Sequence, residues 1–231
     1  MRVIESISHV TVATPDIETS VADYTHLLGT EPVASDGAFA FGTGNIALVL
    51  RAVPGEPAGM SGFAFRTKDI EKARQGFARC GLASAGDGVF DARATHGLPV
   101  AMTDRALPRS KTSAWSLDHV VIRTPNPERA VALYGGRFGL DMRLDRSNPD
   151  WNARLMFFRC GDLVVEIAHV LSDGVSDGPD TFGGLSWRVP DIDAEHARLS
   201  AQGFELSPVR TGRRSGSKVC TVRNRTSGVP T

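Results

Sequence analysis

The sequence predicts an α+β chain built from four tandem β-α-β-β-β modules. The first observation behind this prediction is a strand phrase that occurs twice, at Ile7–Pro15 and again at Leu117–Pro125. The second is a helix start, Asp69-Ile70, that recurs later in the chain as Asp191-Ile192. Short strand signals follow each predicted helix, so the repeats indicate two domains of two modules each.

The first module begins with an alternating strand through His9 and continues into a helix. Asp16 is suited to cap that helix, because its carboxylate can accept hydrogen bonds from free backbone N–H groups. Apolar residues at positions 17, 21, 24 and 28 form one helical stripe, and Gly29 suits a left-handed C-terminal cap. Three short strands are then predicted at 31–33, 38–42 and 46–51.

The second module repeats this plan more weakly. Its predicted elements are a strand at 62–66, a helix at 69–79 that Gly81 ends, and weak strands up to Met102. Residues 104–113 have no apolar period, so we expect them to link the two domains. The predicted domains are residues 1–108 and residues 114–231.

The third module is the clearest copy of the first. Residues 116–139 align with 6–29 without a gap, and ten of the 24 positions are identical. Asn126 and Pro127 suit the N-cap and the first position of its helix. Strands are predicted at 141–144, 154–159 and 163–169.

The fourth module is predicted as a strand at 184–189, a helix at 191–202 and strands at 204–209 and 218–223. Gly228–Thr231 resembles Gly97–Val100, which opens the last predicted strand of the first domain. We therefore expect the last strand of the fourth module to begin where this sequence ends.

Composition narrows the classes of function. Lys plus Arg and Asp plus Glu number 26 each, and this balance argues against nucleic acid as a partner. No apolar run reaches 18 residues and no secretory leader is recognisable, so neither a membrane nor export is expected. Three widely separated cysteines favour reduced thiols in a cytoplasmic protein. A small-molecule partner is expected, and a homodimer stays open.

The repeated modules resemble the vicinal oxygen chelate superfamily, which includes glyoxalase I, bleomycin-binding proteins and type I extradiol dioxygenases. The residues behind the resemblance are Leu117–Ile122, Ala132–Leu140 and Leu185–Ile192. The resemblance implies curved sheets that form clefts, in which a divalent metal often chelates vicinal oxygens of the substrate. The fold serves unrelated chemistries, so the resemblance alone does not fix the reaction.

The resemblance also implies where metal ligands would lie. His119 stands at the first-strand ligand position, and Glu166 stands at the last-strand position of the same module. Imidazole and carboxylate suit Fe, Mn, Zn or Ni. Glu166 alternates with apolar Val165 and Ile167, and a carboxylate among such residues is costly to bury unless it is paired or coordinated. The alternatives are a carboxylate bonded to an arginine and a hydrogen-bonded sheet histidine.

Other ligand positions lack suitable side chains. Gly184 stands where metal-binding relatives have a third ligand, and a fourth would come from the last strand. In the first domain Val49 and Gly62 replace ligands, so we expect His9 to be structural. The sequence therefore predicts at most one metal, in the second domain, or none. Because an imidazole must be neutral to ligate, binding should fade below about pH 6.

Two arginines and a serine are candidate substrate-binding residues. Strand alternation puts Arg123 on the face of His119, and it puts Ser186 and Arg188 on the face of Gly184. A guanidinium suits a carboxylate or a phosphate, so we expect an anionic substrate. The alternative is an arginine that pairs with Glu166 or reaches solvent.

Two functions follow from these residues. One is a metal-dependent enzyme of the dioxygenase or glyoxalase (lyase or isomerase) kind, acting on a small acidic or phenolic substrate. The other is a metal-free protein that sequesters a small molecule, as bleomycin-binding proteins do. The sequence favours the first slightly.

Overall fold

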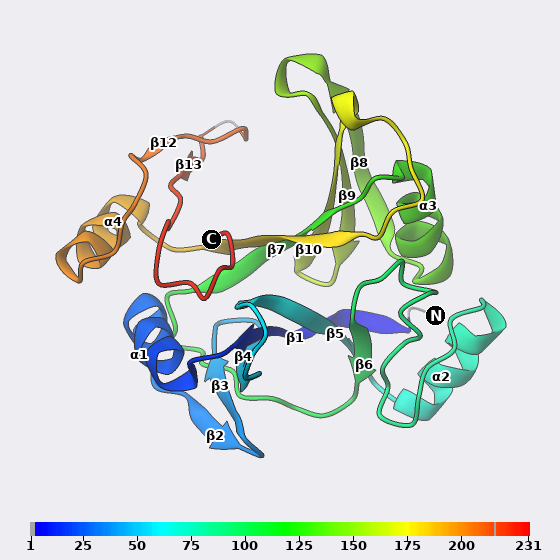
Figure 1. Ribbon diagram of the computed structural model, residues 1–231, viewed down its shortest axis with the longest axis horizontal. Helices are drawn as coiled ribbons and strands as arrows, with labels where there is room; N and C mark the ends of the chain where they lie inside the picture. The colour runs from blue at the N-terminus through cyan, green and yellow to red at the C-terminus, as the bar shows by residue number, and fades with distance from the viewer. Residues whose placement is uncertain (1–2, 215) are drawn as a thin grey trace. The chain divides into compact units, whose positions relative to one another are not determined.

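The computed structural model describes residues 3–214 and 216–231. The first half of the chain forms β1 (Ile4–Thr14), α1 (Ile17–Leu28), β2 (Val33–Ser35), β3 (Ala38–Gly42), β4 (Ala47–Ala52), β5 (Gly59–Thr67), α2 (Ile70–Arg79) and β6 (Val100–Thr103). The second half forms β7 (Ser116–Arg123), α3 (Pro127–Val131), the π-helix η1 (Ala132–Arg137), β8 (Asp141–Asn148), η2 (Pro149–Trp151), β9 (Ala153–Cys160), β10 (Leu163–Val170), η3 (Leu171–Asp173), β11 (Thr181–Arg188), α4 (Ile192–Ala201), β12 (Arg210–Thr211) and β13 (Lys218–Val219) (Figure 1).

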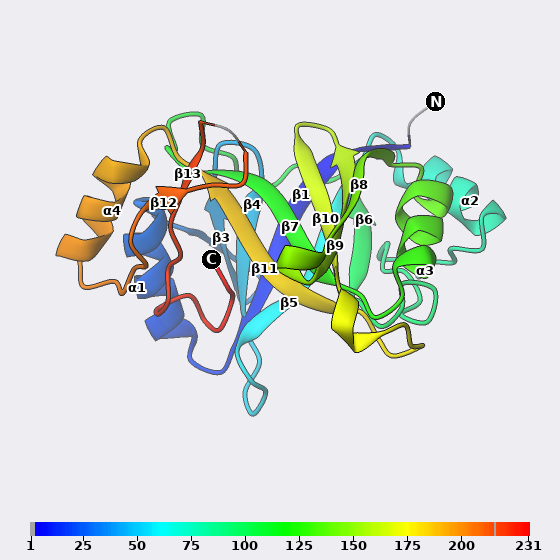
Figure 2. The same cartoon turned by 90° about the horizontal axis from the view of Figure 1, so that it is seen from above.

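Two mixed sheets organise these elements. Strands β1 to β6 form one sheet in the order β2-β3-β4-β1-β5-β6, and β7 to β11 form the other in the order β11-β7-β10-β9-β8 (Figure 2). The first sheet contains the parallel pair β5 with β6, the second contains the parallel pair β7 with β10, and each sheet also contains antiparallel pairs. This arrangement confirms the predicted α+β fold of β-α-β-β-β modules.

The helix starts repeat as the sequence predicts. Each α-helix follows the first strand of its module and is preceded by an Asp or Asn. The side chain of this residue accepts a hydrogen bond from the backbone N–H of the residue three positions later. The pairs are Asp16 with Thr19, Asp69 with Lys72, Asn126 with Arg129 and Asp191 with Ala194. These caps satisfy donors that the first helical turn leaves without a partner, so one local signal starts all four helices.

By its contacts the chain divides into two compact units, each made of separate segments. Compact unit 1 contains residues 3–10, 62–106 and 118–183, and compact unit 2 contains 11–61, 107–117 and 184–231. Strands β1, β5, β7 and β11 each contribute residues to both. The division into domains 1–108 and 114–231 stays a prediction.

An aromatic cluster fills the core of compact unit 1. The ring of Phe138 lies 5.0 Å from Phe65, 5.3 Å from Phe90 and 5.7 Å from Tyr134, centroid to centroid. All four residues are buried. Such rings pack edge to face or tilted and contribute both apolar area and specific geometry. The ring of Phe77 on α2 lies 5.8 Å from Phe138, so the cluster joins α2 to the third-module helix.

In compact unit 2 the helices α1 and α4 are joined by an arginine. Arg198 donates hydrogen bonds to the carbonyl oxygens of His26 and Leu27, at 2.8 and 2.7 Å. These carbonyls end α1 and have no partner inside the helix. Tyr24, also on α1, is buried and donates to the carbonyl of Thr226 at 2.9 Å.

The largest differences from the predicted extents lie in the second half of the chain. The helix after Asn126 is α-helical only to Val131 and continues as a π-helix, in which the N–H of Phe138 donates to the carbonyl of Leu133. Strand β8 runs to Asn148, beyond the predicted Leu144, because it pairs with β9 along its whole length. The strands predicted at 204–209 and 218–223 shorten to β12, β13 and one bridge between Leu206 and Val222.

Within the described part of the chain, no helix has the length and apolar character that crossing a membrane requires. Cys80, Cys160 and Cys220, all of them described, form no disulfide.

Candidate functional site

His119 and Glu166 meet on the third module's sheet, on the adjacent parallel strands β7 and β10. Their register pairs Val164 with His119 and Glu166 with Val121. Imidazole Nε2 of His119 lies 3.1 Å from carboxylate Oε2 of Glu166. Alternation along β10 buries Val165 and Ile167 completely and leaves Glu166 on the other face, as the sequence predicts.

A second carboxylate contacts the same imidazole. Oδ2 of Asp118 lies 2.8 Å from Nδ1 of His119. Strand alternation places Asp118 on the opposite face from His119, so the sequence did not indicate this contact. The only signal was its position directly before the histidine, because the ring can turn back toward its neighbour. The imidazole is thus held between two carboxylates.

The two carboxylates change the protonation of His119. Burial by itself lowers the pKa of the imidazole, but the hydrogen bonds and negative charges of Asp118 and Glu166 outweigh burial and raise the pKa to about 9. In the metal-free protein at pH 7 the ring is therefore an imidazolium that donates from both nitrogens.

An aromatic surface adjoins the histidine. Phe157 on β9 is paired in register with Glu166 and with Leu144 of β8. Its ring is stacked on the His119 ring, with centroids 6.4 Å apart and planes 22° apart. Leu144 is 38% exposed. This face of the sheet therefore offers a flat apolar surface beside charged groups.

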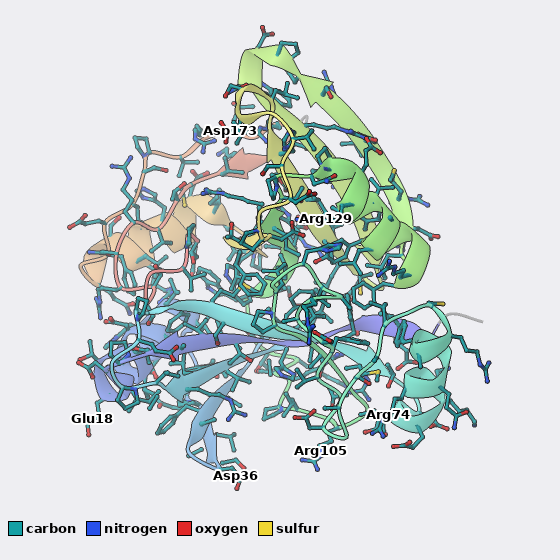
Figure 3. The ribbon with its side chains drawn as sticks, turned by 45° about the vertical axis from the view of Figure 1, so that its right-hand side comes forward. Glu18, Asp36, Arg74, Arg105, Arg129 and Asp173 are labelled. Atoms are coloured by element: carbon teal, nitrogen blue, oxygen red, sulfur yellow. The ribbon has the colours of Figure 1, made fainter. Side chains whose placement is uncertain are left out.

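Arg123 is the last residue of β7. Strand alternation puts it on the same face as His119, and it is exposed. The turn after it is fixed by a buried carboxylate: Thr124 Oγ1 and Arg129 Nη2 donate to Asp180 Oδ1 at 2.7 and 2.9 Å. Arg129, labelled in Figure 3, extends from α3. Asp180 is fully buried, so the exit of β7 is held in one position.

Ser186 and Arg188, the other predicted substrate-binding residues, belong to compact unit 2. Ser186 lines a cavity there, and Arg188 is exposed at the end of β11. Their roles stay predictions.

The pair His119 and Glu166 suits a divalent metal in chemistry and spacing. Two atoms that ligate one ion at about 2.1 Å and at a right angle lie about 3 Å apart. The 3.1 Å between Nε2 and Oε2 meets this requirement. Asp118 on Nδ1 matches the outer carboxylate that orients most metal-binding histidines. In the described residues, however, no group of three or more His, Cys, Asp or Glu could hold a metal.

Gly184 shows why a third ligand is missing. Its φ is +134°, a conformation that residues other than glycine rarely adopt, and an added Cβ would collide with the carbonyl oxygen of Pro230. In the first domain, Val49 packs in an apolar cluster with Ala38 and Ala47, and a Cβ on Gly62 would lie 3.0 Å from the Pro99 carbonyl. These positions pack against backbone or apolar side chains.

Part of the chain matches a known protein family. Residues 118–221 match the model of the glyoxalase/bleomycin resistance protein/dioxygenase superfamily. No curated protein matches the chain by sequence.

Solved structures resemble nearly the whole chain. A triple mutant of 4-hydroxymandelate synthase from Streptomyces coelicolor has a TM-score of 0.72 at 14% identity, covering 95% of this chain and 87% of its own. The 2,3-dioxygenase LapB from Pseudomonas sp. KL28 has a TM-score of 0.69 at 16% identity, covering 96% and 88%. The Mn(II)-bound glyoxalase from Novosphingobium aromaticivorans has a TM-score of 0.66 at 18% identity, covering 89% and 73%. Residues 118–221 thus match the glyoxalase/bleomycin resistance protein/dioxygenase superfamily, and nearly the whole chain shares the fold of these solved structures.

Proposed function

We propose that the protein is a glyoxalase- or dioxygenase-like enzyme that acts on a small acidic or phenolic substrate beside a divalent metal held by His119 and Glu166. The observation behind this proposal is the 3.1 Å approach of Nε2 to Oε2, with Asp118 on the other ring nitrogen. Similar folds in a Mn(II)-bound glyoxalase and in 2,3-dioxygenases support the class of chemistry.

The residues of the chain have separate tasks in this proposal. Asp118 fixes the ring of His119 and keeps Nδ1 protonated, so that Nε2 faces Glu166. Phe157 offers its ring to an aromatic substrate, and the exposed guanidinium of Arg123 offers two parallel donors to an acidic group. A metal bound here would act as a Lewis acid on vicinal substrate oxygens.

Two ligands leave most of the coordination sphere to water and substrate. This count favours, as a second candidate function, metal-free binding of a small acidic molecule. In that state the charge of the His119 imidazolium is balanced by Asp118 and Glu166, and Arg123 at the end of the same strand provides positive charge for an anion.

The test is calorimetric titration of chelator-treated protein with Mn²⁺ and with Zn²⁺, and we expect one equivalent per chain. The imidazole must lose its proton before it can ligate a metal. The raised pKa therefore moves the pH below which metal binding fades from the expected value near 6 toward 9. The apparent affinity should therefore rise about tenfold per pH unit between pH 7 and 8.5, with release of about one proton.

His119→Gln and Glu166→Gln should each abolish this binding. His26→Gln is the matched control, because His26 is exposed on α1 and its ring contacts the carbonyl of Ala22 and the side chain of Arg225. Two equivalents per chain, or one that survives both substitutions, would refute the assignment. Absence of binding under all loadings, together with unaided binding of an aromatic carboxylate such as benzoate, would establish the second function instead.

The arginines are tested separately. Replacing Arg123 and Arg188 by Gln should weaken the binding of an acidic substrate analogue by roughly 1.5–3 kcal/mol, the usual contribution of a charged hydrogen bond. Titration of each single variant with benzoate assigns the effect. Unchanged binding in both variants contradicts a role for these side chains.

A further inference from the structure

Strand β8 forms an outer edge of the sheet in the second half of the chain, with β9 on its inner side (Figure 1). Seven of its eight residues are exposed, and the last, Asn148, is half-buried. Within the described residues no strand pairs with the outward N–H and C=O groups of β8. Such an edge is a template for a further strand, because the added strand gives these groups hydrogen-bond partners.

Exposed apolar side chains gather at this edge. Of the seven large apolar residues that are exposed in the described part of the chain, Met142 and Leu144 lie on β8, and Trp151 lies in η2 directly after it. The guanidinium of Arg146 lies 5.6 Å from the centre of the Trp151 ring. Apolar residues that are exposed singly are ordinary, whereas a group of them indicates a contact surface.

A bulge determines which side chains of β8 share a face. Against β9 the paired residues pass from Met142 directly to Leu144, so Arg143 is the extra residue. Alternation on both sides of the bulge places Asp141, Leu144 and Arg146 on one face of the sheet and Met142 on the other. Bulges and charges on an edge strand reject partners that do not match them, so they restrict which strand can pair with β8.

A second, antiparallel copy of β8 matches this pattern. A twofold axis through Leu144, perpendicular to the sheet, keeps directly opposed side chains on the same face. Leu144 then lies opposite its own copy. Asp141 lies opposite Arg146 of the second copy, and Arg146 lies opposite Asp141 of the second copy, once the bulge is taken into account. Opposite charges directly across two strands stabilise the pairing.

Other registers of the same pairing are less favourable. An axis at Asp145 would oppose two carboxylates, and an axis at Arg146 would oppose two guanidinium groups. An axis at Met142 would leave only Asp141 and Leu144 to pair beside it. A shift by one residue would bring side chains of opposite faces together. The charges of β8 therefore complement β8 of a second copy in one register.

We propose that β8 pairs with β8 of a second copy of this chain, so that the protein is a homodimer in which one sheet continues through both copies. The ring of Phe157 is paired in register with Leu144 and is stacked on His119. An apolar strip on the face of His119 would therefore cross the twofold axis from one copy to the other. The pairing needs neither metal nor substrate, so it does not depend on the proposed function.

The first test measures the mass of the protein by sedimentation equilibrium over a range of concentrations. We expect the wild type to reach twice the chain mass of 24.7 kDa. Asp141→Arg or Arg146→Asp alone opposes like charges and should weaken the dimer about tenfold or more. The double variant Asp141→Arg/Arg146→Asp restores opposite charges and should recover most of this loss. Arg79→Asp is the matched control, because Arg79 is exposed at the end of α2.

The second test measures the register by cross-linking, and it does not rely on the charge variants. Opposed Cα atoms in an antiparallel pair lie within the distance that a disulfide spans. In a Cys80→Ser background, which removes the exposed thiol, Leu144→Cys should form a disulfide-linked dimer on mild oxidation. Val33→Cys is the matched control, because Val33 is exposed on the edge strand β2 of the other sheet, and it should stay unlinked.

Three results would overturn the proposal. The first is a wild-type mass of one chain at every concentration up to the solubility limit. The second is a dimer that neither single charge reversal weakens, since it would use another surface. The third is Leu144→Cys protein that remains dimeric by mass but forms no more disulfide than the Val33→Cys control.

Discussion

His119 illustrates, at the scale of one residue, how neighbours decide the chemistry of a side chain. A histidine in a strand is ordinarily half protonated near pH 6.5, and burial lowers that value. Here the hydrogen bonds and charges of Asp118 and Glu166 raise the pKa to about 9 instead. The same two carboxylates that suit a metal therefore favour a proton when no metal is present.

This pKa predicts a pH dependence of stability in chelator-treated protein. Because the folded pKa lies above the unfolded value of about 6.5, the stabilisation is complete below pH 6.5 and is lost as pH rises through 9. The loss attributable to His119 should be roughly 2–3 kcal/mol between pH 6 and pH 10. Urea unfolding at several pH values measures it.

His119→Gln is the control for that measurement, because glutamine does not titrate in this range. The variant should lose most of the decline with pH between 6.5 and 9. An equal decline in the wild type and in the variant would show that other groups cause it. A proton NMR titration of the His119 ring gives the pKa directly, and a value below 7 would contradict the described geometry.

At the scale of an element, the third-module helix shows how two glycines alter a repeated design. In the first module α1 is a regular helix of 12 residues. In the third module Gly135 and Gly136 replace Thr25 and His26, and the helix changes to π geometry from Ala132. Glycine is among the weakest helix formers, so the local preference for the α-helical pattern is reduced there.

Substitution of each of these two glycines by alanine should have a different effect on stability. At Gly136 an added Cβ meets nothing within 4 Å, and Gly136→Ala should stabilise the protein by about 0.5–1 kcal/mol through reduced freedom of the unfolded chain. At Gly135 the Cβ would lie 3.3 Å from the ring of buried Phe158, so Gly135→Ala should gain less or destabilise. Thermal unfolding of both variants compares their stabilities. A higher stability of Gly135→Ala than of Gly136→Ala would contradict this packing.

At the scale of the whole molecule, the repeat extends to contacts far apart in the chain. Gly44 packs so closely on Ser116 that a Cβ would collide with the hydroxyl. Its counterpart Gly161 packs on Ser6 in the same manner, with a Cβ at 2.9 Å. Ser6 and Ser116 are themselves equivalent positions of the repeated strand. The turn after β3 therefore packs against β7, and the equivalent turn after β9 packs against β1.

Asn45 fixes one of these contacts. Its amide donates to the carbonyl of Leu117 at 2.9 Å and accepts from the N–H of Leu117 at 2.8 Å, and both residues are buried. Asn45→Ala should cost about 2–4 kcal/mol of unfolding free energy, because two buried backbone groups lose their partner. Urea denaturation measures the change. Gln75→Ala is the control, because Gln75 is an exposed amide on α2, and an equal loss in both variants would contradict the explanation.

The sequence by itself determined the modules and their order. Helix starts, glycine caps and strand alternation depend on neighbours along the chain, so Asp16, Asn126 and the alternation of Glu166 with Ile167 could be predicted. The pairing of His119 with Glu166 followed from the repeat together with the resemblance. The π-helix and the short β12 and β13 did not, because they depend on glycine packing and on which strands find neighbours.

Only the tertiary structure decided the electrostatics and the packing of the site. That Asp118 turns onto its neighbour His119 depends on a side-chain conformation, and that Pro230 closes the position of Gly184 depends on a contact between separate segments. Both depend on tertiary packing, whereas sequence patterns report local periodicity. The sequence thus determined which residues share a strand face, and the fold determined which charges, carbonyls and rings they meet there.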